Sequence, residues 1–250
     1  MKISVITVCY NSAKTIEHAL RSVAGQDLSE VEHIVIDGAS SDDTLKVIAE
    51  HGQHVATLVS EKDRGIYDAM NKGVAHASGD VICFLNSDDR YVRSDVLSRV
   101  AELISSHDLD AVFGDVAFFR PEAPETLIRR FRSDRFSPER LSQGWMPAHP
   151  ALFMRRHVYE RVGPFKIDYR IAGDFEFIVR AFGGPQQLRY LHLPEVLVHM
   201  MQGGASTGGL KAKITLNREF LRACRENGVD TNMLRLLSRY PLKALEMFMR

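Results

Sequence analysis

The sequence predicts an α/β protein with a mostly parallel sheet, helices on both flanks and a helical C-terminal tail. Two observations lead to this fold class. Short apolar runs typical of buried strands alternate with stretches whose apolar residues recur at helical spacing. Such alternation gives parallel strands joined by right-handed crossovers. Finally, residues 211–250 hold nine Lys and Arg but only four Asp and Glu, which marks a basic tail as a separate unit.

The first 116 residues predict one βα folding unit. Residues 3–9 form an apolar strand, and the helix that begins at Ser12 ends at Gly25. Further strands are expected at 33–36, 57–60, 81–85 and 111–113. Further helices are expected at 41–52, where Ser41 is the cap, at 66–77 and at 94–103.

Beyond residue 116 the βα alternation breaks. Residues 117–119 and 127–131 are expected to pair as antiparallel strands across a turn that contains Pro121 and Pro124. The expected division of the chain is therefore 1–116, 117–210 and 211–250.

Composition is that of an ordinary soluble protein, with 45% hydrophobic and 26% charged residues in a chain of 250. The formal net charge of zero argues against a nucleic-acid binder held by bulk charge. The three cysteines, Cys9, Cys83 and Cys224, have no metal-ligand spacing and suit a reducing compartment. The apolar run at 3–10 is too short to span a bilayer and lacks a cleavage site. We therefore expect a cytoplasmic protein.

Polar residues follow the early strands where each strand ends. Asn11 follows the first strand, Asp37 the second, and Asn86-Ser87-Asp88-Asp89 the strand at 81–85. Taken alone, Asp88 and Asp89 would suit a solvated turn that caps the next helix. Parallel strands, however, bring their carboxyl ends to one edge, where α/β proteins bind ligands. Because neither a Gly-x-Gly-x-x-Gly nor a Walker-type motif is present, a nucleotide bound there must be held by side chains and a metal.

Four segments together resemble glycosyltransferase family 2 in order and spacing. They are residues 6–11 (ITVCYN), 35–44 (VIDGASSDDT), 63–73 (DRGIYDAMNKG) and 85–89 (LNSDD). The resemblance covers residues 1–209 and is strongest up to residue 90. It implies a Rossmann-like GT-A fold, a nucleotide-sugar donor, a divalent metal and transfer with inversion at the anomeric carbon. Bacterial exopolysaccharide and colanic-acid-type glycosyltransferases are similar.

Carried over by position, the resemblance assigns a donor site. The positions that match are Thr7, Tyr10, Asn11, Asp37, Arg64, Asp68, Asn71, Lys72, Asn86 and Ser87. Thr7 and Tyr10 would line the nucleoside, and Asp37 would accept a hydrogen bond from the base. Arg64 would lie near the phosphates or the ribose, and the three polar residues after it share one helix face that would point into the crevice. The structural alternatives are strand-end turns, helix caps, a surface ion pair and a solvated helix face.

The segment Asn86-Ser87-Asp88 takes the place of the family's Asp-x-Asp, so Asp88 matches the metal-binding acid. One carboxylate is lost, although Asn86 keeps an amide for the ribose or a metal-bound water. Mn²⁺ and Mg²⁺ both prefer oxygen ligands and use one or two carboxylates together with substrate phosphates, so the choice between them stays open. A divalent cation held here would stabilise the departing nucleoside diphosphate.

By the same resemblance, the second part of the chain faces the acceptor. Asp174 matches the acid at the start of the family's catalytic helix, with Gly173 in place of a preceding acid, and is the candidate general base. Its structural alternative is a helix N-cap. Glu176 competes, but two residues further along a helix it points roughly the opposite way. Positions expected at the acceptor or in a closing glycine-rich loop are Trp145, His149, Gly203, Gly204 and Ser206.

The resemblance implies sugar transfer from a nucleotide donor, with UDP-sugars favoured, to a glycan or lipid-linked acceptor in envelope or exported polysaccharide synthesis. Two alternatives stay open. A sugar-nucleotide nucleotidyltransferase would use a related sheet, but its Gly-rich pyrophosphate loop is missing. A glycan-binding relative without turnover is kept open by the departures at Asn86 and Gly173.

The basic tail predicts a contact of its own. Apolar Leu234 and Leu237 alternate with basic Arg235 and Arg239, as in helices that lie on an anionic membrane surface. We therefore expect peripheral contact with the inner face of the membrane through residues 211–250. The alternative is that these helices pack on the catalytic domain. No nucleic-acid partner is expected.

Overall fold

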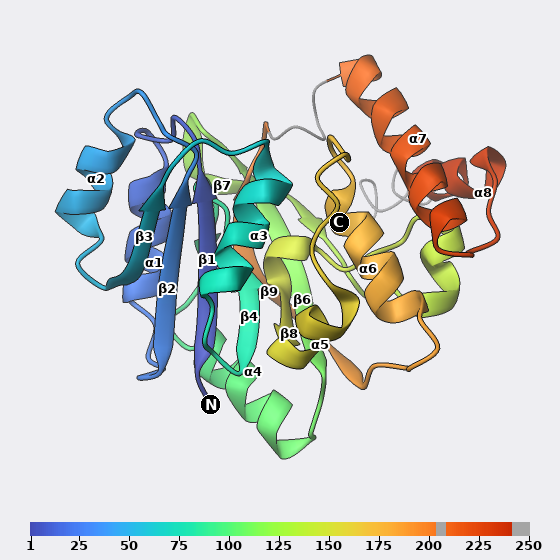
Figure 1. The fold of residues 1–250 in the computed structure, drawn as a ribbon, viewed down its shortest axis with the longest axis horizontal. Coiled ribbons are helices and arrows are strands. Elements are labelled where there is room, and N and C mark those ends of the chain that lie inside the picture. Colours follow the sequence, from blue (N-terminus) through green and yellow to red (C-terminus); the bar gives the residue numbers. More distant parts are fainter. Residues whose placement is uncertain (204–208, 242–250) are drawn as a thin grey trace.

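The computed structural model describes residues 1–203 and 209–241 and shows one mixed sheet flanked by helices (Figure 1). The strands are β1 (Ile3–Cys9), β2 (Val31–Asp37), β3 (Val55–Ser60), β4 (Val81–Phe84), β5 (Arg90–Tyr91), β6 (Ala111–Arg120), β7 (Ala123–Phe131), β8 (Leu152–Arg155) and β9 (Tyr190–Met201). The α-helices are α1 (Ile16–Ala24), α2 (Thr44–His51), α3 (Ile66–His76), α4 (Val96–Ser106), α5 (Arg156–Val162), α6 (Gly173–Gly183), α7 (Gly209–Glu226) and α8 (Met233–Leu237). Two 3-10 helices are η1 (Pro138–Gln143) and η2 (His149–Ala151).

The first four strands form the parallel part of the sheet, in the order β3-β2-β1-β4. β1 pairs in parallel with β2 and β4, and β3 pairs in parallel with β2. Helices α1, α2 and α3 connect them, as the alternation of patterns predicts. The carboxyl ends of all four strands therefore meet at one edge, the upper edge in Figure 1.

The second part of the chain adds its strands with mixed directions, so the sheet is less parallel than the sequence predicts. β8 lies between β4 and β6 and is antiparallel to both. β7 pairs antiparallel with β6, which confirms the expected hairpin. β9 runs parallel to β6 and antiparallel to β5. For β7 the physical reason is the short connection from Arg120 to Ala123, because a parallel partner needs a crossover of about a dozen residues or more.

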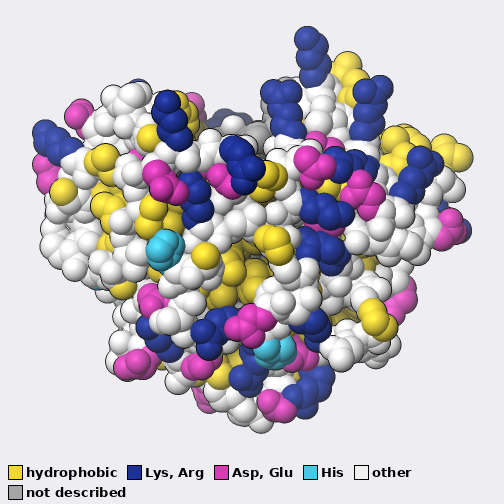
Figure 2. Space-filling view, in the orientation of Figure 1, with side chains coloured by type: hydrophobic (Ala, Val, Ile, Leu, Met, Phe, Trp, Pro, Cys, Tyr) yellow, Lys and Arg dark blue, Asp and Glu magenta, His cyan; other side chains and the backbone are white. Residues whose placement is uncertain are grey.

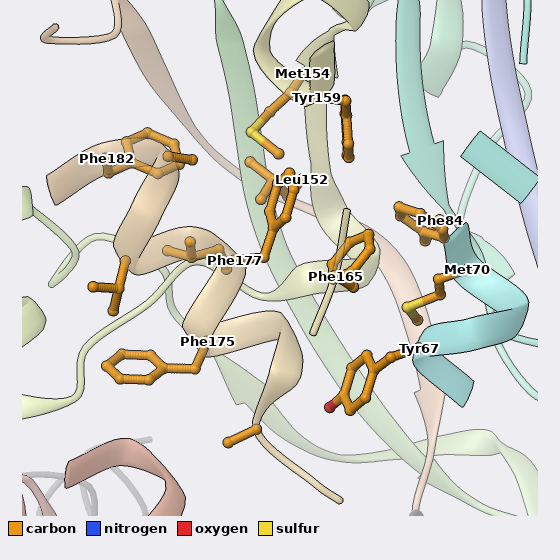
Figure 3. Packing of buried hydrophobic residues seen from close by; sticks show 14 of the residues in the cluster. Tyr67, Met70, Phe84, Leu152, Met154, Tyr159, Phe165, Phe175, Phe177 and Phe182 are labelled. Carbon is orange, nitrogen blue, oxygen red and sulfur yellow. The ribbon is translucent and has the colours of Figure 1, made fainter. Parts of the chain in front are cut away.

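Apolar side chains of β1 alternate between the two faces of the sheet, as a period of two requires. Ile3 and Val5 join the cluster under α1 and α4, whereas Ile6 and Val8 join the cluster under α3, α5 and α6. In the second cluster Phe165 lies between Tyr67 of α3 and Phe177 of α6 (Figure 3). The stacked rings of Phe165 and Phe177, with centroids 4.4 Å apart, help to fix α6 against the sheet edge.

Two helices begin later than the sequence predicts. α1 begins at Ile16 rather than at Ser12, and α2 begins at Thr44 rather than at Ser41. The polar residues before them instead tie the ends of β1 and β2 together. The backbone N–H of Ser12 donates to the Thr44 hydroxyl (2.7 Å), and that of Ser41 donates to the Asn11 side chain (2.9 Å). Both bonds join residues about 30 positions apart in the chain, so the sequence before each helix does not reveal them.

The described part of the tail packs on the catalytic part of the chain. The rings of Phe220 on α7 and Phe175 on α6 stack with centroids 3.9 Å apart. Arg239 is only 2% exposed, its guanidinium lies 4.4 Å from the Phe220 ring centroid, and it donates to Asn217 (2.9 Å). The alternative of packed helices therefore holds for this part, although Leu234 stays 82% exposed. No helix of residues 1–203 or 209–241 is long and apolar enough to cross a membrane.

Candidate active site

A cavity of about 870 Å³ opens at the carboxyl ends of β1 and β4. Its walls come from the ends of β1, β4 and β9, the first turns of α3 and α6, and η2. The polar lining side chains are Tyr10, Asn11, Ser12, Lys14, Thr15, Asp42, Asp63, Tyr67, Asn86, Ser87, Asp88, Asp89, His149, Arg170 and Asp174. The expected crevice is thus present, and acids dominate its charge.

The turn after β4 presents four oxygen-bearing side chains to this cavity. Asp88 is half-buried, whereas Asp89 is only 1% exposed. The Asn86 amide nitrogen donates to the Asp89 carboxylate (3.0 Å), which leaves the Asn86 carbonyl oxygen as an acceptor. The Ser87 hydroxyl donates to the Ser12 hydroxyl (2.9 Å) and so fixes this turn against the end of β1.

Negative charge on these two adjacent acids is unfavourable. Burial raises the pKa of Asp88, and burial followed by the neighbouring Asp88 carboxylate raises the pKa of Asp89 well above its ordinary value. A divalent cation would offset this charge, and the oxygen donors suit Mn²⁺ or Mg²⁺. No group of three or more His, Cys, Asp or Glu with metal-site geometry occurs among the described residues. The residues therefore fit a cation that completes its coordination with water and a substrate diphosphate.

Asp174 enters the cavity from the first turn of α6. Its carboxylate accepts the N–H of Phe175 (2.8 Å), and it lies at a helix N-terminus, where negative charge is favoured. Burial nevertheless outweighs these bonds and raises the pKa of Asp174 from 3.8 to about 6. A carboxyl group with this pKa is suited to accept a proton near neutral pH.

Glu176, the competing acid, lies elsewhere. It is fully buried and forms ion pairs with Arg180 (2.8 Å) and Lys166 (3.0 Å). It does not line the cavity. Glu176 therefore points away from the cavity that Asp174 lines, as the helical spacing predicts.

The structure explains why Gly173 stands where the resemblance places an acid. A Cβ atom at position 173 would lie 2.7 Å from the ring of Tyr67. The Tyr67 hydroxyl donates to the carbonyl of Ile171 (2.6 Å). The Tyr67 ring therefore packs directly against the start of α6. This contact holds the backbone next to Asp174 and leaves no room for another side chain.

Seven of the predicted residues meet in the cavity. They are Tyr10, Asn11, Asn86, Ser87, Asp88, His149 and Asp174. His149 stacks on Phe84 with ring centroids 5.2 Å apart, and burial lowers its pKa to about 4. The imidazole is therefore neutral at pH 7. Gly203 follows β9 with φ of 132° and is not part of the cavity wall, whereas Gly204 and Ser206 lie outside the described residues.

Other predicted donor residues do not reach the cavity. Thr7 is fully buried and hydrogen-bonds to His33 (2.9 Å). Asp37 is fully buried too, and its carboxylate accepts from Ser40 (3.0 Å) and from the Ser60 hydroxyl (2.6 Å). Asp37 thus shapes the loops that follow β2 and β3, and it is absent from the cavity wall. The sequence placed both residues at strand ends but did not show which side of the strand each one takes.

The helix face at 68–72 also turns away from the cavity. Arg64 pairs with Asp68 (3.0 Å), not with Asp63, and Lys72 pairs with Glu61 (2.8 Å). The Asn71 amide donates to the Phe165 carbonyl (2.9 Å) and accepts its N–H (2.7 Å). These four residues are therefore structural here. Asp68, Asn71 and Lys72 share one face of α3, as their spacing predicts. This face borders solvent and the loop at Phe165, not the cavity.

Trp145 also lies away from the sugar site that the sequence assigned to it. It is 2% exposed, absent from the cavity wall, and packs beneath Arg135, whose guanidinium lies 5.4 Å from the ring centroid. An amphipathic ring that is the single Trp of the chain suits a core position equally well.

Several lining residues had no role in the sequence prediction. Asp63 reaches the wall because Gly38 has no Cβ, since a Cβ there would lie 2.5 Å from the Asp63 carboxylate. Asp63 and Tyr67 both lie in the segment 63–73, in which Arg64 and Lys72 were assigned to the donor site instead. Arg170 and Lys14 contribute positive charge to the wall and lie outside the recognised segments.

The parallel strands, the antiparallel insertion and the acid-lined edge define a GT-A fold, and solved structures share it. S. aureus TarS 1-349 in complex with UDP-GlcNAc has a TM-score of 0.69 at 20% identity, over 95% of this chain and 71% of that one. Mannosyltransferase PcManGT from Pyrobaculum calidifontis, in complex with GDP-Man and Mn²⁺, has a TM-score of 0.66 at 20% identity, over 92% and 65%. The chain spans only 39% of a longer TarS structure.

Sequence comparison identifies the family. The profile of Glycosyl transferase family 2 matches residues 4–163. A PGL/p-HBAD biosynthesis glycosyltransferase of Mycobacterium bovis is 32% identical over 225 residues, which are 88% of this chain and 82% of that protein. Glycosyltransferase AglE of Haloferax volcanii is 29% identical over 199 residues, 76% and 64% respectively. The chain belongs to glycosyltransferase family 2, and the predicted enzyme class, a glycosyltransferase, is confirmed.

Proposed function

We propose that the protein is an inverting, metal-dependent glycosyltransferase that moves a sugar from a UDP-sugar to an acceptor hydroxyl in the synthesis of a cell-envelope or exported glycan. The observation that carries this proposal is a single cavity that brings the Asp88 carboxylate of one element and the Asp174 carboxylate of another to the same space. The name of the mycobacterial relative, which refers to biosynthesis, agrees with such a role.

The proposal gives the cavity residues two separate roles, cation binding and proton transfer. Asp88 and the Asn86 carbonyl would hold a divalent cation, which when bound supplies positive charge to the departing diphosphate. Asp174 would take the proton of the acceptor hydroxyl as this oxygen attacks the anomeric carbon. Its raised pKa follows from burial, and the Phe175 N–H keeps its carboxylate oriented. The neutral His149 imidazole and the Tyr10 ring line the same cavity.

The two alternatives from the sequence are less well supported. A nucleotidyltransferase would need cations for a triphosphate, yet the cavity wall has five Asp residues against Lys14 and Arg170. A binding relative without turnover would have no use for a buried carboxyl group with a raised pKa at a helix start.

The proposed function is tested with a panel of UDP-, GDP- and dTDP-sugars in the presence of Mn²⁺, by following nucleotide release. Slow hydrolysis is expected from a UDP-sugar and at least tenfold less from the others. TarS complexes with UDP-GlcNAc and PcManGT with GDP-Man show that this fold accepts either base. Equal or reversed preference would contradict the uridine assignment, and no release from any donor, with or without added glycan acceptors, would contradict turnover.

We also propose that the start of α7 contacts an anionic membrane surface. Leu210 and Ile214 are 75% and 45% exposed, and Lys211 and Lys213 between them are exposed as well. Figure 2 shows basic side chains around an apolar one over the upper end of this helix. This combination favours an interface with anionic lipid.

Replacing Lys211 and Lys213 together by Gln is expected to weaken binding to phosphatidylserine vesicles about thirtyfold, because each Lys near such a surface contributes about 1 kcal/mol. Co-sedimentation measures the effect, with the exposed Lys46 of α2 replaced by Gln as the control. Truncation is a poorer test, since Leu236 and Arg239 are buried. Binding that is insensitive to the double replacement would count against this membrane contact.

A further inference from the structure

A second groove, of about 280 Å³, adjoins the main cavity. It lies between the first turn of α3 and the segment 167–170, and it shares four lining residues with the main cavity. The groove is lined by Arg64, Gly65, Ile66, Tyr67, Ile167, Asp168, Tyr169 and Arg170. Tyr67 belongs to both spaces and contacts Gly173, so the groove leads to the side of the cavity where Asp174 lies.

Positive charge in this groove comes chiefly from Arg170. Its side chain is exposed, it lines both spaces, and none of the described acids is ion-paired with its guanidinium. Its backbone N–H donates to Glu219 (2.8 Å), which anchors the segment while the side chain stays available. The Asp168 carboxylate is occupied by Arg222, and Arg64 is already paired with Asp68. Arg170 is therefore the cation best placed to receive an anion.

The same groove exposes apolar surface. Ile66 is 45% exposed and Ile167 is 36% exposed, and the rings of Tyr67 and Tyr169 line the groove beside them. Ile66 begins α3 on one wall of the groove, and Ile167 lies on the opposite wall. A ligand complementary to this surface needs an apolar portion as well as a negative charge.

We propose that this groove binds the acceptor and that the acceptor is an anionic amphiphile, in which a phosphate or carboxylate is joined to an apolar group. The guanidinium of Arg170 binds the anion through paired N–H donors, which match two oxygens of a carboxylate or a phosphate. The apolar group lies between Ile66 and Ile167. An acceptor held in this way extends a hydroxyl past Tyr67 toward Asp174. The acceptor role rests on the proposed function, whereas binding of the anionic amphiphile does not.

The test uses calorimetry on the full chain, first alone and then with UDP and Mn²⁺ at saturation. Hexyl phosphate and heptanoate represent the two anions, hexyl glucoside is a neutral probe with the same alkyl chain as hexyl phosphate, and inorganic phosphate lacks the chain. At least one anionic amphiphile is expected to bind at least tenfold more tightly than hexyl glucoside and inorganic phosphate. Arg170→Gln should lose about tenfold or more of that affinity, since hydrogen bonds to charged groups are among the stronger ones. Lys46→Gln removes an exposed charge from α2 and should bind like the unaltered chain.

Three results would overturn the proposal. Hexyl glucoside could bind as tightly as the anions, or Arg170→Gln could bind them unchanged. In the third, Arg170→Gln weakens UDP with Mn²⁺ as much as the anionic amphiphile, which would assign Arg170 to the donor. Failure of the unaltered chain to bind any nucleoside diphosphate would instead contradict the proposed function alone, because the groove is judged by the anion series.

Discussion

Asp174→Asn is expected to lower the sugar transfer rate by about 10²–10⁴-fold, the usual contribution of a general base. An amide at this position cannot accept the acceptor proton, although it keeps the shape and the bond from the Phe175 N–H. Donor affinity should stay within about threefold, because Asp88 and the β1 turn lie on other elements. Initial rates and donor dissociation constants, measured on the same preparations, separate the two effects.

The pH profile of the unaltered enzyme gives the same residue a second signature. The base must be ionised to act, and the raised pKa of Asp174 is about 6. The rate is therefore expected to fall as the pH drops through about 6 and to be level above about 7. An acid limb centred near 4, the value of an ordinary Asp, would contradict the assignment.

Stability supplies the folding control for this variant. A carboxyl group with a raised pKa in the fold costs stability above that pKa and costs nothing below its unfolded value near 3.8. Asp174→Asn should therefore melt at the same or a higher temperature than the parent at pH 7.5. Glu176→Gln should melt lower, because it breaks a buried pair with Arg180, but its folded fraction should keep the rate. A dead Glu176 variant beside an Asp174 variant within a few-fold of the parent would reverse the roles.

Asp88→Asn is expected to abolish the metal dependence of donor binding and to lower turnover by about 10²-fold or more, since a catalytic metal contributes several kcal/mol. The carboxylate is half-buried beside Asp89, and burial raises its pKa, so a cation would relieve unfavourable charge. Calorimetry of UDP with and without Mn²⁺ measures the effect. In this variant the two titrations should coincide.

Asp63→Asn is the matched control for that experiment. Asp63 also lines the cavity, but it lies before α3, and its carboxylate accepts the Gly65 N–H (2.8 Å) as an Asn side chain also can. The Mn²⁺ dependence should persist in this variant. The metal assignment would be wrong if Asp63→Asn lost that dependence while Asp88→Asn kept it.

The first part of the fold was predictable because its signals are local. Each of β1 to β4 contains an apolar run, and the helices between them have apolar residues at helical spacing. Crossover rules then give the sheet. β9 was not predicted, because it contains Pro194 and polar residues such as His192 and pairs with β6, about 80 residues earlier in the chain. The short strands β5 and β8 likewise owe their existence to distant partners.

The site was predictable where chemistry and position coincide. Asp88 follows β4 and Asp174 lies in the first turn of α6, so both line the crevice where the family resemblance placed them, and their roles stay predictions. The base contact of Asp37 stays a prediction, because an acid at a strand end can serve either a ligand or its own turn, and here Ser40 and Ser60 donate to its carboxylate. Arg170 was not predicted, because its position in a groove depends on α3, which forms the opposite wall.

The most direct test of the account is a crystal grown with UDP and Mn²⁺ and measured at the manganese absorption edge. We predict one strong anomalous peak within coordinating distance of the Asp88 carboxylate and of the diphosphate, with the Asp174 carboxylate facing the vacant sugar position. A peak held by other residues, or a UDP molecule bound outside the cavity lined by Asp88 and Asp174, would contradict it.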